Sequence, residues 1–134
     1  MKKITLFLLM FFCLGLTACS KDAEVQSFIT EFDAATKEMA DKINANPSSA
    51  GVDEAQKSFD AKKDSLKAKF DSFKNARQAQ LSADMLKKFT DSFKNNTQLL
   101  SDTMQKNAMK LSQDKDAMPK LQKLLQDYQN TFKM

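Results

Sequence analysis

The scarcity of helix-breaking residues constrains this chain more than any other feature of its sequence. The 134 residues include only two glycines and two prolines, so a sheet built with tight turns is not expected. Apolar residues instead recur at steps of three and four, which is the period of one face of an α-helix. The sequence therefore predicts an all-α fold, an antiparallel bundle of about four amphipathic helices.

Four segments carry such an apolar stripe, and they bound the predicted helices. These helices span about residues 22–45, 53–79, 83–111 and 117–132. The stripes consist of Val25, Phe28, Phe32, Ala35, Met39 and Ile43; Val52, Ala55, Phe59, Leu66, Phe70 and Phe73; Leu86, Phe89, Phe93, Leu100, Met104, Ala108 and Leu111; and Leu121, Leu124, Leu125, Tyr128 and Phe132. Pro47 separates the first two helices, because the residue before a proline avoids helical geometry.

The boundary between the second and third helices contains neither glycine nor proline and rests on capping. Ser82 is a suitable N-cap, and Asp84 adds negative charge to the following turn. The alternative is one unbroken helix of about 58 residues, roughly 87 Å long, which would need an oligomer to bury its apolar face. At the last helix, Asp116 is the expected N-cap and Pro119 fits the first turn.

A short repeat predicts an aromatic cluster. The sequence Asp-Ser-Phe-Lys-Asn at 71–75 recurs at 91–95. A chain reversal near residue 81 would place Phe73 opposite Phe89. The cluster could form a core or a pocket for an aromatic ligand, and the helical spacing of its residues favours the core.

The N-terminal segment has the pattern of a signal peptide. Lys2 and Lys3 precede a largely apolar run at 4–16, which is too short to span a membrane comfortably. This run closes on Leu16-Thr17-Ala18-Cys19, which resembles the lipobox of bacterial lipoproteins. The resemblance implies cleavage between Ala18 and Cys19 and attachment of diacylglycerol, carrying acyl chains such as palmitate, to the Cys19 sulfur.

The residues after Cys19 bear on location. In lipoproteins of didermic bacteria an aspartate at this position commonly retains the protein in the inner membrane, so by resemblance Ser20 favours the outer membrane, with the protein facing the periplasm. The segment Lys21-Asp22-Ala23-Glu24 partly resembles a surface-export signal, which leaves surface display open. Only about three residues would separate Cys19 from the first helix, a reach of about 10 Å, so we expect the bundle to lie against its membrane.

The residue types narrow the chemistry. The chain has no histidine, and its two cysteines are Cys13, inside the signal, and Cys19. The mature residues 19–134 would therefore lack the commonest general base, a free thiol and any intrachain disulfide. No serine–lysine pair stands out. We predict no catalytic residue, no cofactor and no metal site, and hence a protein that is not an enzyme.

Charge argues against nucleic acid as a partner. The chain has a net charge of +4, but loss of Lys2 and Lys3 leaves 19 basic against 17 acidic residues, or +2, with no dense basic run. Residues 20–50 hold three lysines against six acids, whereas residues 51–134 hold 16 basic residues against 11 acids. This asymmetry predicts that the first helix packs against the rest of the chain.

Polar residues interrupt the apolar stripes of the second and third predicted helices, and these interruptions have more than one interpretation. The same is true of the methionines. Lys62-Lys63 and Asn95-Asn96-Thr97 could line a cleft or a partner surface. More simply, the lysine stems pass along the core and Asn96 lies near the edge of the bundle. Five of the eight methionines could form a soft binding surface or fill gaps in the core. They are Met39, Met85, Met104, Met109 and Met118.

Together these features predict a non-enzymatic envelope lipoprotein that is held to the membrane by its lipid and binds an envelope protein. Two alternatives remain, namely a carrier or chaperone for an apolar ligand and an inhibitor or immunity lipoprotein against an envelope-acting enzyme. An empty apolar cavity of several hundred cubic ångströms would favour the carrier. A filled core with an exposed apolar patch would favour partner binding. The oligomeric state is left open.

Overall fold

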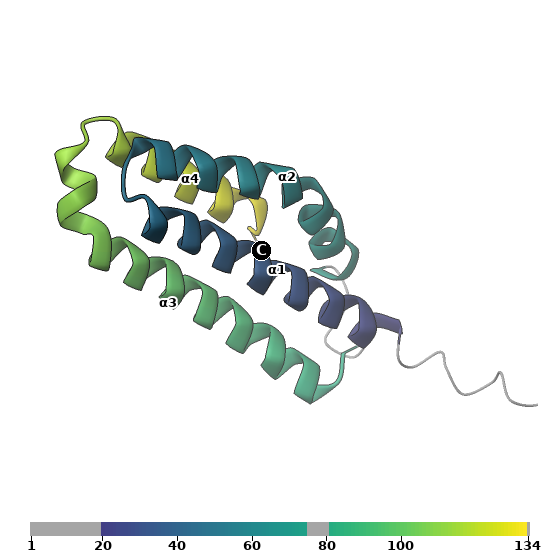
Figure 1. Ribbon diagram of the computed structural model, residues 1–134. Coiled ribbons are helices and arrows are strands. Elements are labelled where there is room, and N and C mark those ends of the chain that lie inside the picture. Colours follow the sequence, from purple (N-terminus) through teal and green to yellow (C-terminus); the bar gives the residue numbers. More distant parts are fainter. Residues whose placement is uncertain (1–19, 75–80, 134) are drawn as a thin grey trace, which may run out of the picture.

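Four helices make up the fold. The computed structural model describes residues 20–74 and 81–133, and within these ranges it contains helices and no strand (Figure 1). The helices are α1 (Ser20–Ala45), α2 (Ser49–Lys74), α3 (Ala83–Gln113) and α4 (Ala117–Thr131). The predicted all-α bundle is confirmed. The expected continuation of the second helix to Ala79 lies outside the described residues.

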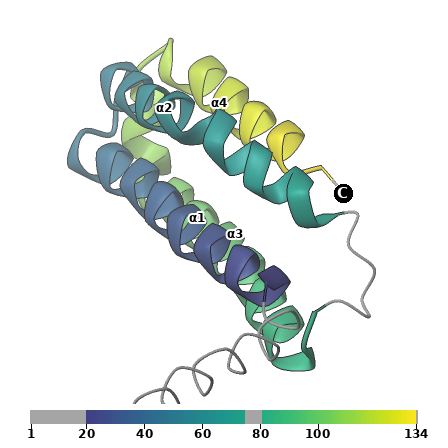
Figure 2. The same ribbon diagram turned by 90° about the vertical axis from the view of Figure 1, so that its right-hand side faces the viewer.

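Successive helices run in opposite directions, but they are not successive neighbours around the bundle. α1 packs against both α2 and α3, α4 packs against α2, and α4 approaches α3 much less closely. Figure 2 shows the result as two side-by-side pairs, α1 with α3 and α2 with α4. The order around the bundle is therefore α1, α2, α4, α3, and the two helices within each pair are parallel.

Aromatic rings fill the centre of the bundle. The cluster contains all eight phenylalanines that follow position 19 and the only tyrosine. Phe28 and Phe32 of α1 lie at its middle, and Phe32 stacks on Phe93 of α3 with ring centroids 4.7 Å apart. Phe73 meets Phe89 edge to face at 5.5 Å. The predicted cluster is confirmed, and it is a packed core.

The turn between α1 and α2 depends on a close backbone approach at Gly51. α2 begins at Ser49, four residues earlier than expected, because Gly51 is accommodated within its first turn. A Cβ on Gly51 would lie only 1.8 Å from the Asn46 carbonyl oxygen. The Asp114 carboxylate accepts a hydrogen bond from the Ser49 backbone N–H at 2.7 Å and so satisfies the start of the helix from outside.

The predicted N-cap of α3 is confirmed. Ser82 has extended backbone angles, φ −67° and ψ 153°, and its hydroxyl accepts a hydrogen bond from the Met85 N–H. The alternative of one unbroken helix is wrong, since residue 82 is not helical.

The predicted N-cap of α4 is correct in position, but its side chain does not make the expected hydrogen bond. Asp116 occupies the N-cap position but makes no side-chain capping bond. Asp114 instead organises this turn, and its carboxylate accepts a hydrogen bond from the Asp116 N–H at 3.0 Å. Pro119 lies in the first turn of the helix, as predicted.

The apolar stripes of α1 and α2 are buried at every predicted position, and in α4 only Leu125 is half-buried. The stripe of α3 is partly wrong. Leu86 is 38% exposed and Ala108 is exposed, whereas Phe89, Phe93 and Met104 are half-buried. The buried side chains of α3 are Met85, Ser92, Asn96, Leu100, Thr103, Asn107 and Leu111. The helix is rotated from its expected orientation because a largely polar face packs on α1.

Candidate functional site

The predicted lipidation site, Cys19, directly precedes the first described residue, Ser20, in the sequence. Ala18 and Cys19 fall outside the described residues, so cleavage and lipidation stay predictions. The structure corrects the expected spacer, because α1 begins at Ser20, the residue that follows Cys19. The bundle would therefore start at the lipid attachment point itself.

Asp22 joins two helices at this end. Its carboxylate accepts a hydrogen bond at 3.0 Å from the backbone N–H of Ser82, the residue that caps α3. Hydrogen bonds from Ser82, with a smaller contribution from the charge of Lys88, hold the pKa of Asp22 below its ordinary value. The start of α1 is thereby tied to the start of α3.

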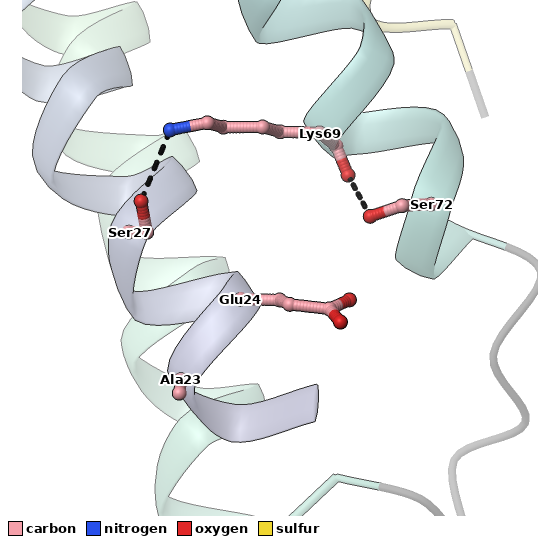
Figure 3. A pocket seen from close by; sticks show the side chains of 5 residues that line it. All are labelled: Ala23, Glu24, Ser27, Lys69 and Ser72. Carbon is pink, nitrogen blue, oxygen red and sulfur yellow. Dashed lines mark hydrogen bonds between the residues drawn. The ribbon is translucent and has the colours of Figure 1, made fainter. Parts of the chain in front are cut away.

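A small pocket lies between α1 and α2 near the same end (Figure 3). Its volume is about 320 Å³, and it is lined by Ala23, Glu24, Ser27, Lys69 and Ser72. The Lys69 ammonium donates a hydrogen bond to the Ser27 hydroxyl at 3.0 Å and forms an ion pair with Glu31. The Ser72 hydroxyl donates to the Lys69 carbonyl at 2.7 Å.

The Ser27–Lys69 contact is a pair that the sequence did not reveal, since 42 residues separate its members. A lysine that activates a serine has to be neutral. The Glu31 carboxylate stabilises the charged ammonium of Lys69 instead, and the Ser27 hydroxyl is exposed. This geometry suits a structural link between the helices and does not suit a nucleophile with its base.

Ion pairs cross the contact between α1 and α2 along its length. Glu38 pairs with Lys62, and Lys42 pairs with Glu54 at 3.6 Å. Glu31 and Glu38 of the acidic first helix thus pair with lysines of the second, as the charge asymmetry predicted, whereas the Lys42–Glu54 pair has the opposite polarity. Lys62 is half-buried and reaches across to α1, so its place in the stripe is explained by this pairing.

The contact between α1 and α3 is polar at its centre. The Asp33 carboxylate accepts hydrogen bonds from the Ser92 hydroxyl at 2.5 Å and the Asn96 amide at 2.6 Å. Further along, the Asn107 amide donates to the Asn44 side-chain oxygen at 2.8 Å. Asn96 is only 5% exposed, so its predicted position at the bundle edge is wrong. These bonds satisfy buried amides and fix the register of α3 on α1.

The methionines divide into two groups. Met39 and Met85 are buried and Met104 is half-buried, which agrees with a gap-filling role. Met109 and Met118 are 80% and 43% exposed. Of these five methionines, only Met109 on α3 and Met118 on α4 are exposed enough to contribute to the soft surface considered from the sequence.

Within residues 20–74 and 81–133, no three histidine, cysteine or acidic residues lie close enough together to hold a metal ion. None of the described helices is both long and apolar enough to cross a membrane. The sequence matches no protein-family model, and no similar protein was found among curated proteins or solved structures.

Proposed function

We propose that this protein is a lipid-anchored lipoprotein of the bacterial envelope whose helical bundle binds an envelope protein without catalysing a reaction. One observation carries the proposal: the lipobox-like Leu16-Thr17-Ala18-Cys19 stands directly before Ser20, where α1 begins. A lipidated Cys19 would attach the bundle to the membrane without an intervening linker. Two or more acyl chains make such an anchor stable, and Ser20 favours the outer membrane.

The interior of the bundle favours partner binding over ligand carriage. Phe28, Phe32, Phe59 and Phe70 are at most 1% exposed and pack ring against ring. Large apolar side chains nevertheless remain exposed on the surface, namely Leu86, Met109 and Met118. A core packed ring against ring supports an interaction module over a carrier, which would need an apolar cavity for its ligand.

The anchor also orients the bundle. α1 has 26 residues and is about 39 Å long at about 1.5 Å per residue, so a bundle anchored at Cys19 would project up to about that distance. The α1–α2 and α3–α4 turns lie together at the opposite end, where Asp114 links them (Figure 1). The sides of the helices then face partners that lie within about 40 Å of the membrane.

Crosslinking with mass spectrometry on the native protein in its own cells tests this proposal. We expect one envelope protein to be recovered with links that recur at a defined set of lysines. If the bundle binds a protein and not an apolar ligand, the purified protein should not take up a fluorescent fatty acid. Stoichiometric uptake of that fatty acid, with no recurring crosslink, would establish the carrier instead.

A further inference from the structure

Polar side-chain contacts cross three of the four boundaries between neighbouring helices. The pairs are Lys62–Glu38 and Lys69–Glu31 between α1 and α2, Ser92–Asp33 and Asn96–Asp33 between α1 and α3, and Lys120–Asp53 and Gln56–Asp127 between α2 and α4. Both α3 and α4 lie wholly in the described ranges, yet no side-chain hydrogen bond or ion pair joins them. The α3–α4 boundary is also the least closely packed of the four.

Helical spacing shows which side chains of α4 face this boundary. Lys120 and Asp127, seven residues apart, contact Asp53 and Gln56 of α2. Met118 and Leu125 are also seven residues apart and lie on the opposite flank of the helix, at about 100° per residue. They therefore lie on the side of α4 that is turned towards α3.

The same reasoning applies to α3. Asn96 and Asn107 bond to α1, and Met104 lies about a quarter turn further round the helix. Phe93 lies on the same side and meets Phe132, at the end of α4, with centroids 6.2 Å apart. We call Phe93, Met104, Met118 and Leu125 the α3–α4 seam.

The seam leaves part of the core exposed. Phe93, Met104 and Leu125 pack against the core but are only half-buried, and Met118 is 43% exposed. One helical turn beyond the four seam residues lie exposed, uncharged side chains, namely Thr97, Ala108, Gln122 and Gln129. The seam is thus an apolar strip with uncharged side chains one turn further along each helix, and its two methionines can adapt their shape to a partner.

Charge indicates what would bind there. Residues 83–133 hold nine lysines and six aspartates, a net charge of +3, whereas residues 20–74 hold nine lysines and eleven acids, a net charge of −2. A symmetric dimer through the seam would bring two basic surfaces together, which is unfavourable. An acidic partner would be attracted to this half of the bundle.

We propose that the α3–α4 seam is the docking site for an amphipathic helix of a protein partner, with an apolar stripe and acidic flanks. The apolar stripe would cover the four seam residues, and the acidic flanks would face the lysines of α3 and α4. This is the mode in which apolar residues at helical spacing anchor a peptide. The inference rests on the proposed function, because it names the partner surface of the same module.

Methionine methyl groups provide the test. The protein purified from cells, labelled with ¹³C at its methionine methyls, is placed in phosphatidylcholine nanodiscs. The probe is a 20-residue peptide with leucine at helical spacing and glutamate elsewhere. We expect the signals of Met104 and Met118 to shift, while buried Met39 and exposed Met109 stay unchanged. Added salt should weaken the effect, and a peptide with lysine in place of glutamate should not bind.

A matched pair of variants locates the contact. Met118→Glu places a negative charge in the seam and should weaken the acidic peptide by about tenfold or more. Met109→Glu makes the same change at the more exposed methionine outside the seam and should leave the affinity within about twofold. Circular dichroism checks that both variants keep their helices.

Other occupants give different results, each of which would overturn the proposal. Seam signals that shift with protein concentration alone would indicate a second copy of the chain. Shifts caused by phosphatidylglycerol nanodiscs without peptide would indicate the membrane surface. Absence of any peptide effect at Met104 and Met118 would exclude the seam as a helix site. If crosslinks in cells then still reached a partner through another face, the proposed function would stand without this inference.

Discussion

Gly51 shows how one residue permits the fold. Its missing Cβ leaves room for the Asn46 carbonyl oxygen, which would otherwise lie 1.8 Å away. Because the obstacle is backbone, Gly51→Ala should shift the α1–α2 turn and lower the free energy of unfolding by about 3 kcal/mol. Urea denaturation measures this loss. Ala50→Ser is the control, since Ala50 is exposed, and a Gly51→Ala protein as stable as this control would contradict the close approach.

Asp114 makes stability depend on pH. Hydrogen bonds from Ser49 and Asp116 hold the pKa of Asp114 below its ordinary value of 3.8. A carboxyl group with a lowered folded pKa stabilises the fold above its unfolded pKa, and this contribution is lost as the pH falls through the folded pKa. Asp114→Asn should therefore lower Tm at neutral pH, and the difference from the parent protein should shrink below about pH 3.8.

Thermal unfolding followed by circular dichroism from about pH 7 to pH 2 covers this window. Asp64→Asn is the control, because Asp64 is exposed; its Tm should follow that of the parent protein at each pH. A Tm deficit in Asp114→Asn that stayed constant with pH would mean that the ionised carboxylate does not hold the turns together.

At the scale of elements, the sequence predicted where the helices lie. It predicted the buried face correctly for α1 and α2 but only in part for α3. α1 and α2 bury their apolar stripes, so spacing alone identified the buried face. The centre of α3 buries Ser92 and Asn96, which hydropathy assigns to solvent. Their burial is possible only because Asp33, about 60 residues earlier, accepts their hydrogen bonds. The Ser27–Lys69 pair and the α3–α4 seam escaped prediction for the same reason, since both depend on which helices become neighbours.

The aromatic core makes a prediction at this scale. Phe73 is 4% exposed and meets half-buried Phe89 across the α2–α3 diagonal. Truncating a buried phenylalanine to alanine costs about 3 to 5 kcal/mol. The double variant Phe73→Ala with Phe89→Ala should therefore lose about 5 kcal/mol, a large part of the stability of a domain of this size.

Leu86→Ala on α3 serves as the control, because Leu86 is 38% exposed, and should cost less than about 1 kcal/mol. Calorimetry on the lipid-free protein compares the two. Unchanged thermal stability in the double phenylalanine variant would show that these rings are not a core.

At the scale of the whole molecule, the proposed lipid on Cys19 would join the membrane to a bundle whose first helix begins at the next residue. Asp22 ties the starts of α1 and α3 together at one end of the bundle, and Asp114 ties the two turns together at the other end. Among the described residues, the large apolar side chains that are exposed lie on α3 and α4. A lipidated Cys19 would hold the proposed α3–α4 seam close to the membrane.

The chemical state of Cys19 tests the central claim most directly. Cells grown with labelled palmitate should label the parent protein and Cys13→Ala, which keeps the lipobox, but not Cys19→Ala. Mass spectrometry of the parent protein should find an N-terminal peptide that begins at Cys19 and carries a diacylglyceryl group. A parent protein whose N-terminal peptide lacks lipid, or a Cys19→Ala variant that still incorporates palmitate, would contradict the account.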